Sequence, residues 1–117
     1  MSEIDRMFAE REAKRIEQER QRRQHRDAAA AFLAQFHADD VAVSKALAAH
    51  GISADLVDNR LLLHRAGAGM HADPFVITVG EAGEIDVAGR SLGLYTVGEK
   101  PRLKRELTLE ILTFFDL

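Results

Sequence analysis

Cysteine and tryptophan are absent from this chain of 117 residues, and only two prolines are present. Without cysteine there is no disulfide framework, no thiolate metal ligand and no cysteine nucleophile. No apolar run approaches the roughly 18 residues that a membrane-spanning helix needs. Residues 1–27 lack the apolar stretch of a signal peptide, and their seven acids argue against a transit peptide. We therefore expect a soluble cytoplasmic protein that has no contact with a membrane.

The distribution of charge divides the chain into two parts. Residues 1–27 hold eight basic and seven acidic side chains, whereas residues 28–117 hold eight basic and twelve acidic ones. The apolar fraction of the whole chain, 46%, is ordinary for a folded protein. The sequence thus predicts a charged helical arm over residues 1–27 and a compact domain over residues 28–117.

The arm has the sequence of a solvated helix. Good helix formers dominate residues 11–27, which contain neither glycine nor proline. Opposite charges recur four residues apart, a spacing that stabilises helices. These predicted pairs are Arg6–Glu10, Glu10–Lys14, Arg15–Glu19, Glu19–Arg23 and Arg23–Asp27. A coiled coil is not expected, because polar residues interrupt both core rows of the heptad that begins at Ile4.

The rest of the chain predicts an α+β fold. The expected order is the long charged helix, a second helix, an antiparallel meander of three or four strands and a C-terminal amphipathic helix. Asp39 or Asp40 is expected to cap the second helix, and Gly51 to end it. The last helix begins near Pro101 and buries a stripe at helical spacing. That stripe is Leu103, Leu107, Ile111 and Phe114.

The strands are predicted from alternation and from turn residues. In Phe75–Val79, the residues Phe75, Ile77 and Val79 alternate with Val76 and Thr78. The apolar run Leu61–His64 follows the turn signal Asp58–Asn59. Ile85–Val87 and Leu94–Val97 complete the expected meander, with a turn over Gly89–Gly93. Because an isolated hairpin is only marginally stable in water, the C-terminal helix must cover one face of this sheet.

Three short motifs could carry chemistry, and none has the context that its chemistry needs. Gly89–Gly93 matches the G-x-S-x-G pattern of hydrolase nucleophile elbows, but no histidine follows Ser91. Gly67–Gly69 resembles part of a phosphate loop, but it leads through Pro74 into a strand rather than a helix.

Histidines near carboxylates form the third motif, in His37–Asp40 and His71–Asp73. A metal needs three or four such groups to converge, and adding His50 or His64 gives no defined set. We expect no metal and no cofactor. A small enzyme that uses His64, His71 and Asp73 stays open as an alternative, because catalytic groups need not form linear motifs.

Apolar side chains in excess of one small core point to contact with another protein. At one end of the chain these are Ile4, Met7 and Phe8, and at the other they are Leu109, Leu112 and Phe115. An unpartnered apolar helix face fits a helix-in-groove contact or a homo-oligomer. Folding back of the first group and packing of the second within the domain is the competing interpretation.

A run of arginines supports a second alternative. Arg20, Arg22, Arg23 and Arg26 have no acid between them, and such a run can contact successive phosphates. The chain as a whole has a pI of about 5.9, below that of a dedicated nucleic-acid-binding protein. The main hypothesis is therefore a non-enzymatic protein–protein interaction module (a small adaptor, regulator or inhibitor) that self-associates through its helices. Nucleic-acid binding through the four arginines is the alternative.

Overall fold

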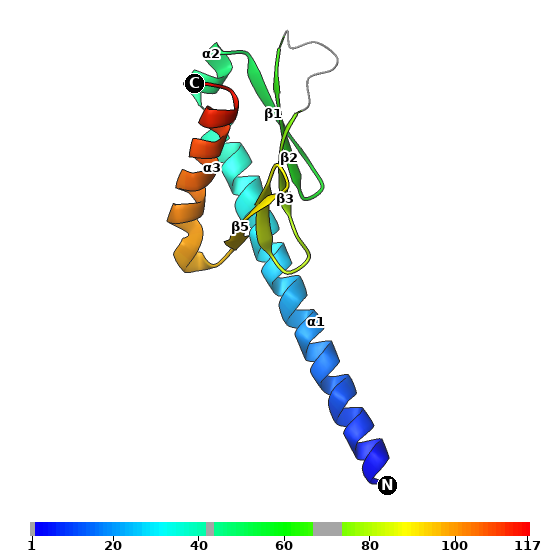
Figure 1. Ribbon diagram of the computed structural model, residues 1–117. Coiled ribbons are helices and arrows are strands. Elements are labelled where there is room, and N and C mark those ends of the chain that lie inside the picture. Colours follow the sequence, from blue (N-terminus) through cyan, green and yellow to red (C-terminus); the bar gives the residue numbers. More distant parts are fainter. Residues whose placement is uncertain (1, 42–43, 67–73) are drawn as a thin grey trace.

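The computed structural model describes residues 2–41, 44–66 and 74–117. Its main feature is helix α1 (Glu3–Phe36), whose N-terminal part projects from the rest of the molecule (Figure 1). At 1.5 Å per residue, the 34 residues of α1 extend over about 50 Å. The molecule measures 68 × 32 × 20 Å as a result.

The described residues form one five-stranded antiparallel sheet in the order of the chain. Its strands are β1 (Ile52–Val57), β2 (Arg60–Arg65), β3 (Phe75–Val79), β4 (Glu84–Val87) and β5 (Arg90–Leu94). The register places buried side chains opposite one another, because Leu61 pairs with Ile77 and Ile77 pairs with Val87. One face of the sheet is therefore continuously apolar, as the alternation in Phe75–Val79 requires.

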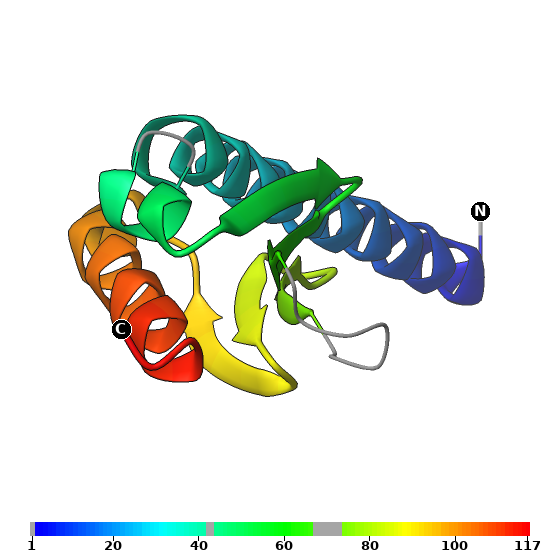
Figure 2. The ribbon, with the colours of Figure 1, turned by 90° about the horizontal axis from the view of Figure 1, so that it is seen from above.

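Two helices cover this apolar face. The C-terminal part of α1 buries Ala29, Phe32, Leu33 and Phe36. Helix α3 (Lys100–Phe114) follows the short 3-10 helix η2 (Val97–Glu99) and buries Leu103, Leu107 and Ile111. Figure 2 shows both helices on the side toward which the sheet curves. The core thus lies between one sheet face and two helices, and residues before Arg26 in α1 take no part in it.

A glycine marks the point where α1 leaves the domain. Gly83 lies in the turn between β3 and β4 with a φ of +88°. A Cβ atom built on Gly83 would lie 2.7 Å from the carbonyl oxygen of His25, in α1. Real Cβ contacts are longer than this, so only glycine lets the turn approach the helix backbone so closely.

The end of α3 is fixed by aromatic side chains and an arginine. The ring of Phe115 is buried and meets the ring of Phe75 with centroids 6.4 Å apart. Arg65 of β2 donates a hydrogen bond to the carbonyl oxygen of Phe115 at 2.6 Å and lies over its ring. These contacts join the C-terminal turn to the sheet.

The predicted α+β fold and element order are confirmed, but the predicted number of strands, three or four, was too low, because the sheet has five. Strand β1 was not predicted, although Ile52–Val57 alternates apolar and polar side chains. The last strand is Arg90–Leu94, so the predicted turn over Gly89–Gly93 and strand over Leu94–Val97 were wrong. The actual turn is Ala88–Gly89, where both residues have positive φ. Two-residue hairpins favour that conformation.

The second helix also begins at a different residue from the one predicted. Asp39 and Asp40 do not cap it, because both lie in a π-helical turn, η1 (His37–Val41), that continues α1. Helix α2 (Lys45–Ala49) begins instead after Ser44. Its end was predicted correctly, since Gly51 follows His50 with a φ of +71°. Residues 42 and 43, between η1 and α2, lie outside the described residues.

None of the helices in the described ranges combines the length and the apolar character needed to cross a membrane.

Candidate functional site

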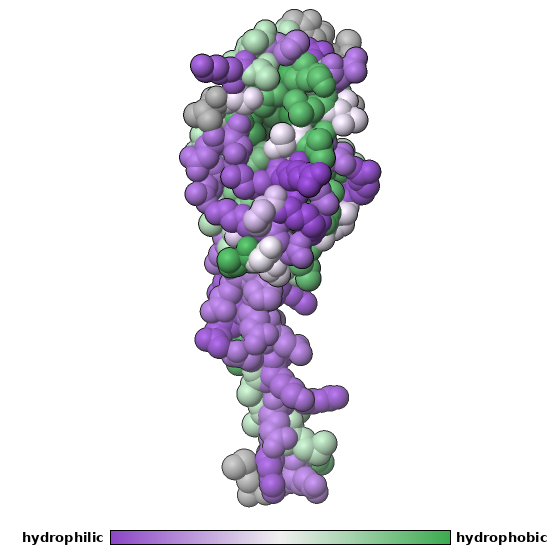
Figure 3. Space-filling model, turned by 90° about the vertical axis from the view of Figure 1, so that its left-hand side faces the viewer, coloured by the Kyte–Doolittle hydropathy of each residue, from purple (hydrophilic) through white to green (hydrophobic). Residues whose placement is uncertain are grey.

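The apolar tip, as we name Ile4, Met7 and Phe8, lies exposed at the free end of α1. The exposed fractions are 75% for Ile4, 58% for Met7 and 72% for Phe8. The spacing i, i+3, i+4 puts the three on one side of the helix. The tip does not fold back onto the domain, and Figure 3 shows green atoms at the far end of a mostly purple arm. An exposed apolar cluster of this kind at the end of a solvated helix is typical of a surface that contacts another molecule.

The helix behind the tip is held by local charge pairs and by its cap. The Ser2 hydroxyl accepts a hydrogen bond from the amide of Asp5 at 3.2 Å, which satisfies one free N–H of the first turn. Arg20 donates two hydrogen bonds to Glu17, which lowers the pKa of the Glu17 carboxyl below its ordinary value. Two observed pairs, Glu12–Arg15 and Glu17–Arg20, are three residues apart rather than the predicted four, and a third, Arg26–Asp27, joins neighbouring residues at 4.0 Å.

The four arginines of the predicted run do not share one face of α1. At about 100° per residue, Arg20 points away from Arg22 and Arg26, and Arg23 lies between these directions. Arg22, Arg23 and Arg26 line a shallow polar groove together with Glu19 and Glu81. Arg20 is engaged by Glu17 instead. The run is therefore split, and two acids border the groove formed by three of its members.

Helical geometry assembles a different basic surface, which we name the cationic face. Its members fall within an arc of about 120° and share that arc with no acid of residues 3–27. They are Arg11, Lys14, Arg15, Arg22 and Arg26. Only Arg22 and Arg26 were in the predicted set. The signal for the other three is visible in the sequence once a continuous helix is assumed over this region.

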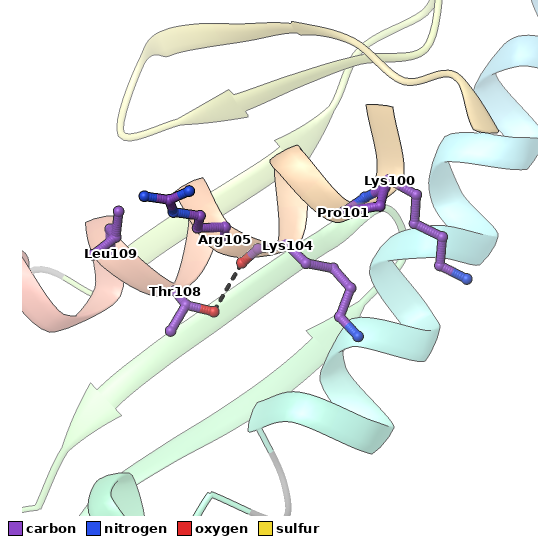
Figure 4. Close-up of a pocket in the computed structure, with 6 residues that line it drawn as sticks. All are labelled: Lys100, Pro101, Lys104, Arg105, Thr108 and Leu109. Carbon is purple, nitrogen blue, oxygen red and sulfur yellow. Dashed lines mark hydrogen bonds between the residues drawn. The ribbon is translucent and has the colours of Figure 1, made fainter. Parts of the chain in front are cut away.

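A second surface lies on the outer side of α3. A hollow of about 610 Å³ is lined by six of the described residues, drawn in Figure 4. They form two neighbouring rows with the spacing i, i+4, i+8: Lys100, Lys104 and Thr108 in one, and Pro101, Arg105 and Leu109 in the other. A second hollow of about 410 Å³ follows on the far side of the latter row. We name the first hollow the α3 groove.

The α3 groove combines cationic and apolar lining residues. Lys100 donates a hydrogen bond to Gln35 at 3.0 Å, and Lys104 forms an ion pair with Asp40 at 3.3 Å. Arg105 is exposed and has no ion pair among the described residues. Leu109 is 52% exposed. Sequence reasoning had identified only Leu109 here, because lysines and arginines on a helix are typical of a solvated face.

The other two contact residues predicted at this end of the chain, Leu112 and Phe115, differ in how far they are buried. Leu112 is half-buried, and Phe115 is in the core with 7% exposure. Phe115 therefore belongs to the folding core and not to the surface, whereas its neighbour Phe114, expected in the buried stripe, is 49% exposed. The stripe of α3 thus continues from Ile111 to Phe115. The two aromatic rings meet edge to face with centroids 4.9 Å apart.

The chemical motifs find little support in the described residues. Ser91 lies in strand β5, not at a turn into a helix, and its hydroxyl accepts a hydrogen bond from the amide of Gly93 at 3.2 Å. Within the described ranges, no three histidine or acidic side chains converge as metal ligands. His37 contacts the carbonyl oxygen of Ala54 at 3.0 Å, and His64 is exposed on β2. Gly67–Gly69, His71 and Asp73 lie outside the described residues.

Comparison with known proteins gave no match, whether with family models, with curated proteins or with solved structures. Fold and surface together define an α+β protein with a projecting helical arm, an apolar tip on that arm and a cationic groove on its last helix.

Proposed function

We propose that this chain is a non-enzymatic protein–protein interaction module, an adaptor, regulator or inhibitor that self-associates through its helices. One observation carries the proposal: three large apolar side chains, Ile4, Met7 and Phe8, are exposed at the end of a helix that projects from the domain. Burying exposed apolar area is the main source of free energy in most protein association. An arm that carries such side chains away from its own core is suited to reaching another molecule.

The geometry of the arm supports the same proposal. All described residues before His25 in α1 are exposed, so the arm gains nothing from tertiary packing. Its ion pairs and its Ser2 cap stabilise the helix locally. A preformed helix loses less conformational entropy on binding than a disordered segment does. The arm is therefore organised in advance for a helical contact.

The test replaces the apolar tip with serine in one variant (Ile4→Ser, Met7→Ser, Phe8→Ser). We expect the wild-type chain to associate and the variant to bind its partner copy at least about tenfold more weakly, since buried apolar anchors dominate interface energies. Sedimentation equilibrium over a concentration series measures this. Circular dichroism should show that the helix content is retained. A wild-type chain that stays monomeric throughout, or a variant with an unchanged dissociation constant, would refute self-association through the tip.

The cationic face supports a second candidate function, binding to the phosphate backbone of a nucleic-acid duplex. Arg11, Lys14, Arg15, Arg22 and Arg26 lie on one side of a straight helix, and the acids of the arm lie on other sides. Phosphates attract such a stripe without regard to base sequence, and the binding weakens with salt. The apolar tip has no role in this candidate function.

Two matched triple variants test it. Arg11→Gln, Lys14→Gln and Arg22→Gln remove charge from the cationic face, whereas Arg6→Gln, Arg20→Gln and Arg23→Gln remove as much from other sides. If the face binds phosphates, only the first variant should lose affinity. Its slope of log K against log salt should fall by about 2–3, at 0.9 per phosphate contact. Fluorescence anisotropy with a labelled DNA duplex measures both. Equal losses in the two variants would argue against a specific face.

A further inference from the structure

We draw no further inference here: the strongest candidate, the α3 groove on the outer side of the last helix, is an open surface of a single helix, and nothing in the described part of the structure shows what covers it.

Discussion

Replacing Gly83 with alanine is expected to destabilise the protein by about 2–5 kcal/mol, from two costs that add. An L-residue in the left-handed region costs about 1–2 kcal/mol, and Gly83 has a φ of +88°. Forcing extra volume into a packed site costs about 1–3 kcal/mol more. The new methyl carbon would lie 2.7 Å from the His25 carbonyl oxygen, so either the turn or the helix must move.

Gly89→Ala is the matched control for this prediction. Gly89 has a φ of +84°, almost that of Gly83, but a Cβ atom there meets nothing within 4 Å. Its substitution should therefore cost only the conformational part, about 1–2 kcal/mol. Urea unfolding of both variants measures the difference. Equal losses of stability in the two variants would mean that the turn does not press against α1.

The turn at Gly83 is also joined to other parts of the domain near the point where the arm leaves it. The amide of Tyr95 donates to the carbonyl oxygen of Gly83 at 2.9 Å, so the turn is joined to the segment after β5 as well as to α1. The Tyr95 ring in turn stacks on Phe32 of α1 with centroids 4.9 Å apart. If alanine at position 83 displaces the turn, the angle at which the arm leaves the domain should change too.

The parts of the fold that the sequence predicts are those with strong periodicity. Phe75–Val79 alternates regularly and is β3, and Leu103, Leu107 and Ile111 repeat every four residues and form the buried stripe of α3. Strand β1 was missed because its serine, alanine and aspartate have weak strand propensity. Strand β5 was missed because glycine residues, at 89 and 93, read as turn signals.

The contacts between distant segments could not be read from periodicity. Nothing in the sequence Gly80–Glu84 indicates that Gly83 touches the backbone of His25, because that contact depends on how α1 crosses the sheet. The same holds for the choice between Phe114 and Phe115, which follow one another at the end of α3. The core takes Phe115, whose carbonyl oxygen accepts a hydrogen bond from Arg65 of β2.

The two candidate surfaces also differ in whether the sequence alone could predict them. The apolar tip was visible because Ile4, Met7 and Phe8 stand out among charged neighbours. The α3 groove was not, because four of its six lining residues are polar and their arrangement in two rows appears only on the folded helix. A groove walled by lysine and arginine stems has apolar character that hydropathy patterns do not report.

Replacing Phe36 with alanine is expected to cost about 3–5 kcal/mol of stability, whereas Phe8→Ala should cost less than about 0.5 kcal/mol. Both residues are phenylalanines of α1, but Phe36 is 2% exposed in the core and Phe8 is 72% exposed at the tip. Truncating Phe36 leaves a cavity beside Phe32, while truncating Phe8 removes a side chain that water already surrounds.

The same pair of variants separates folding from association. Because self-association stabilises the folded state by mass action, Phe8→Ala should match the wild type only where the chain is dilute enough to be monomeric. At higher concentration its melting temperature should fall below that of the wild type, as the wild-type chain gains from its partner and the variant does not. Thermal unfolding at several protein concentrations measures both effects. The opposite outcome would be a wild-type melting temperature that does not change with protein concentration and equals that of Phe8→Ala at every concentration. It would mean that the exposed ring of Phe8 does not contact a second copy.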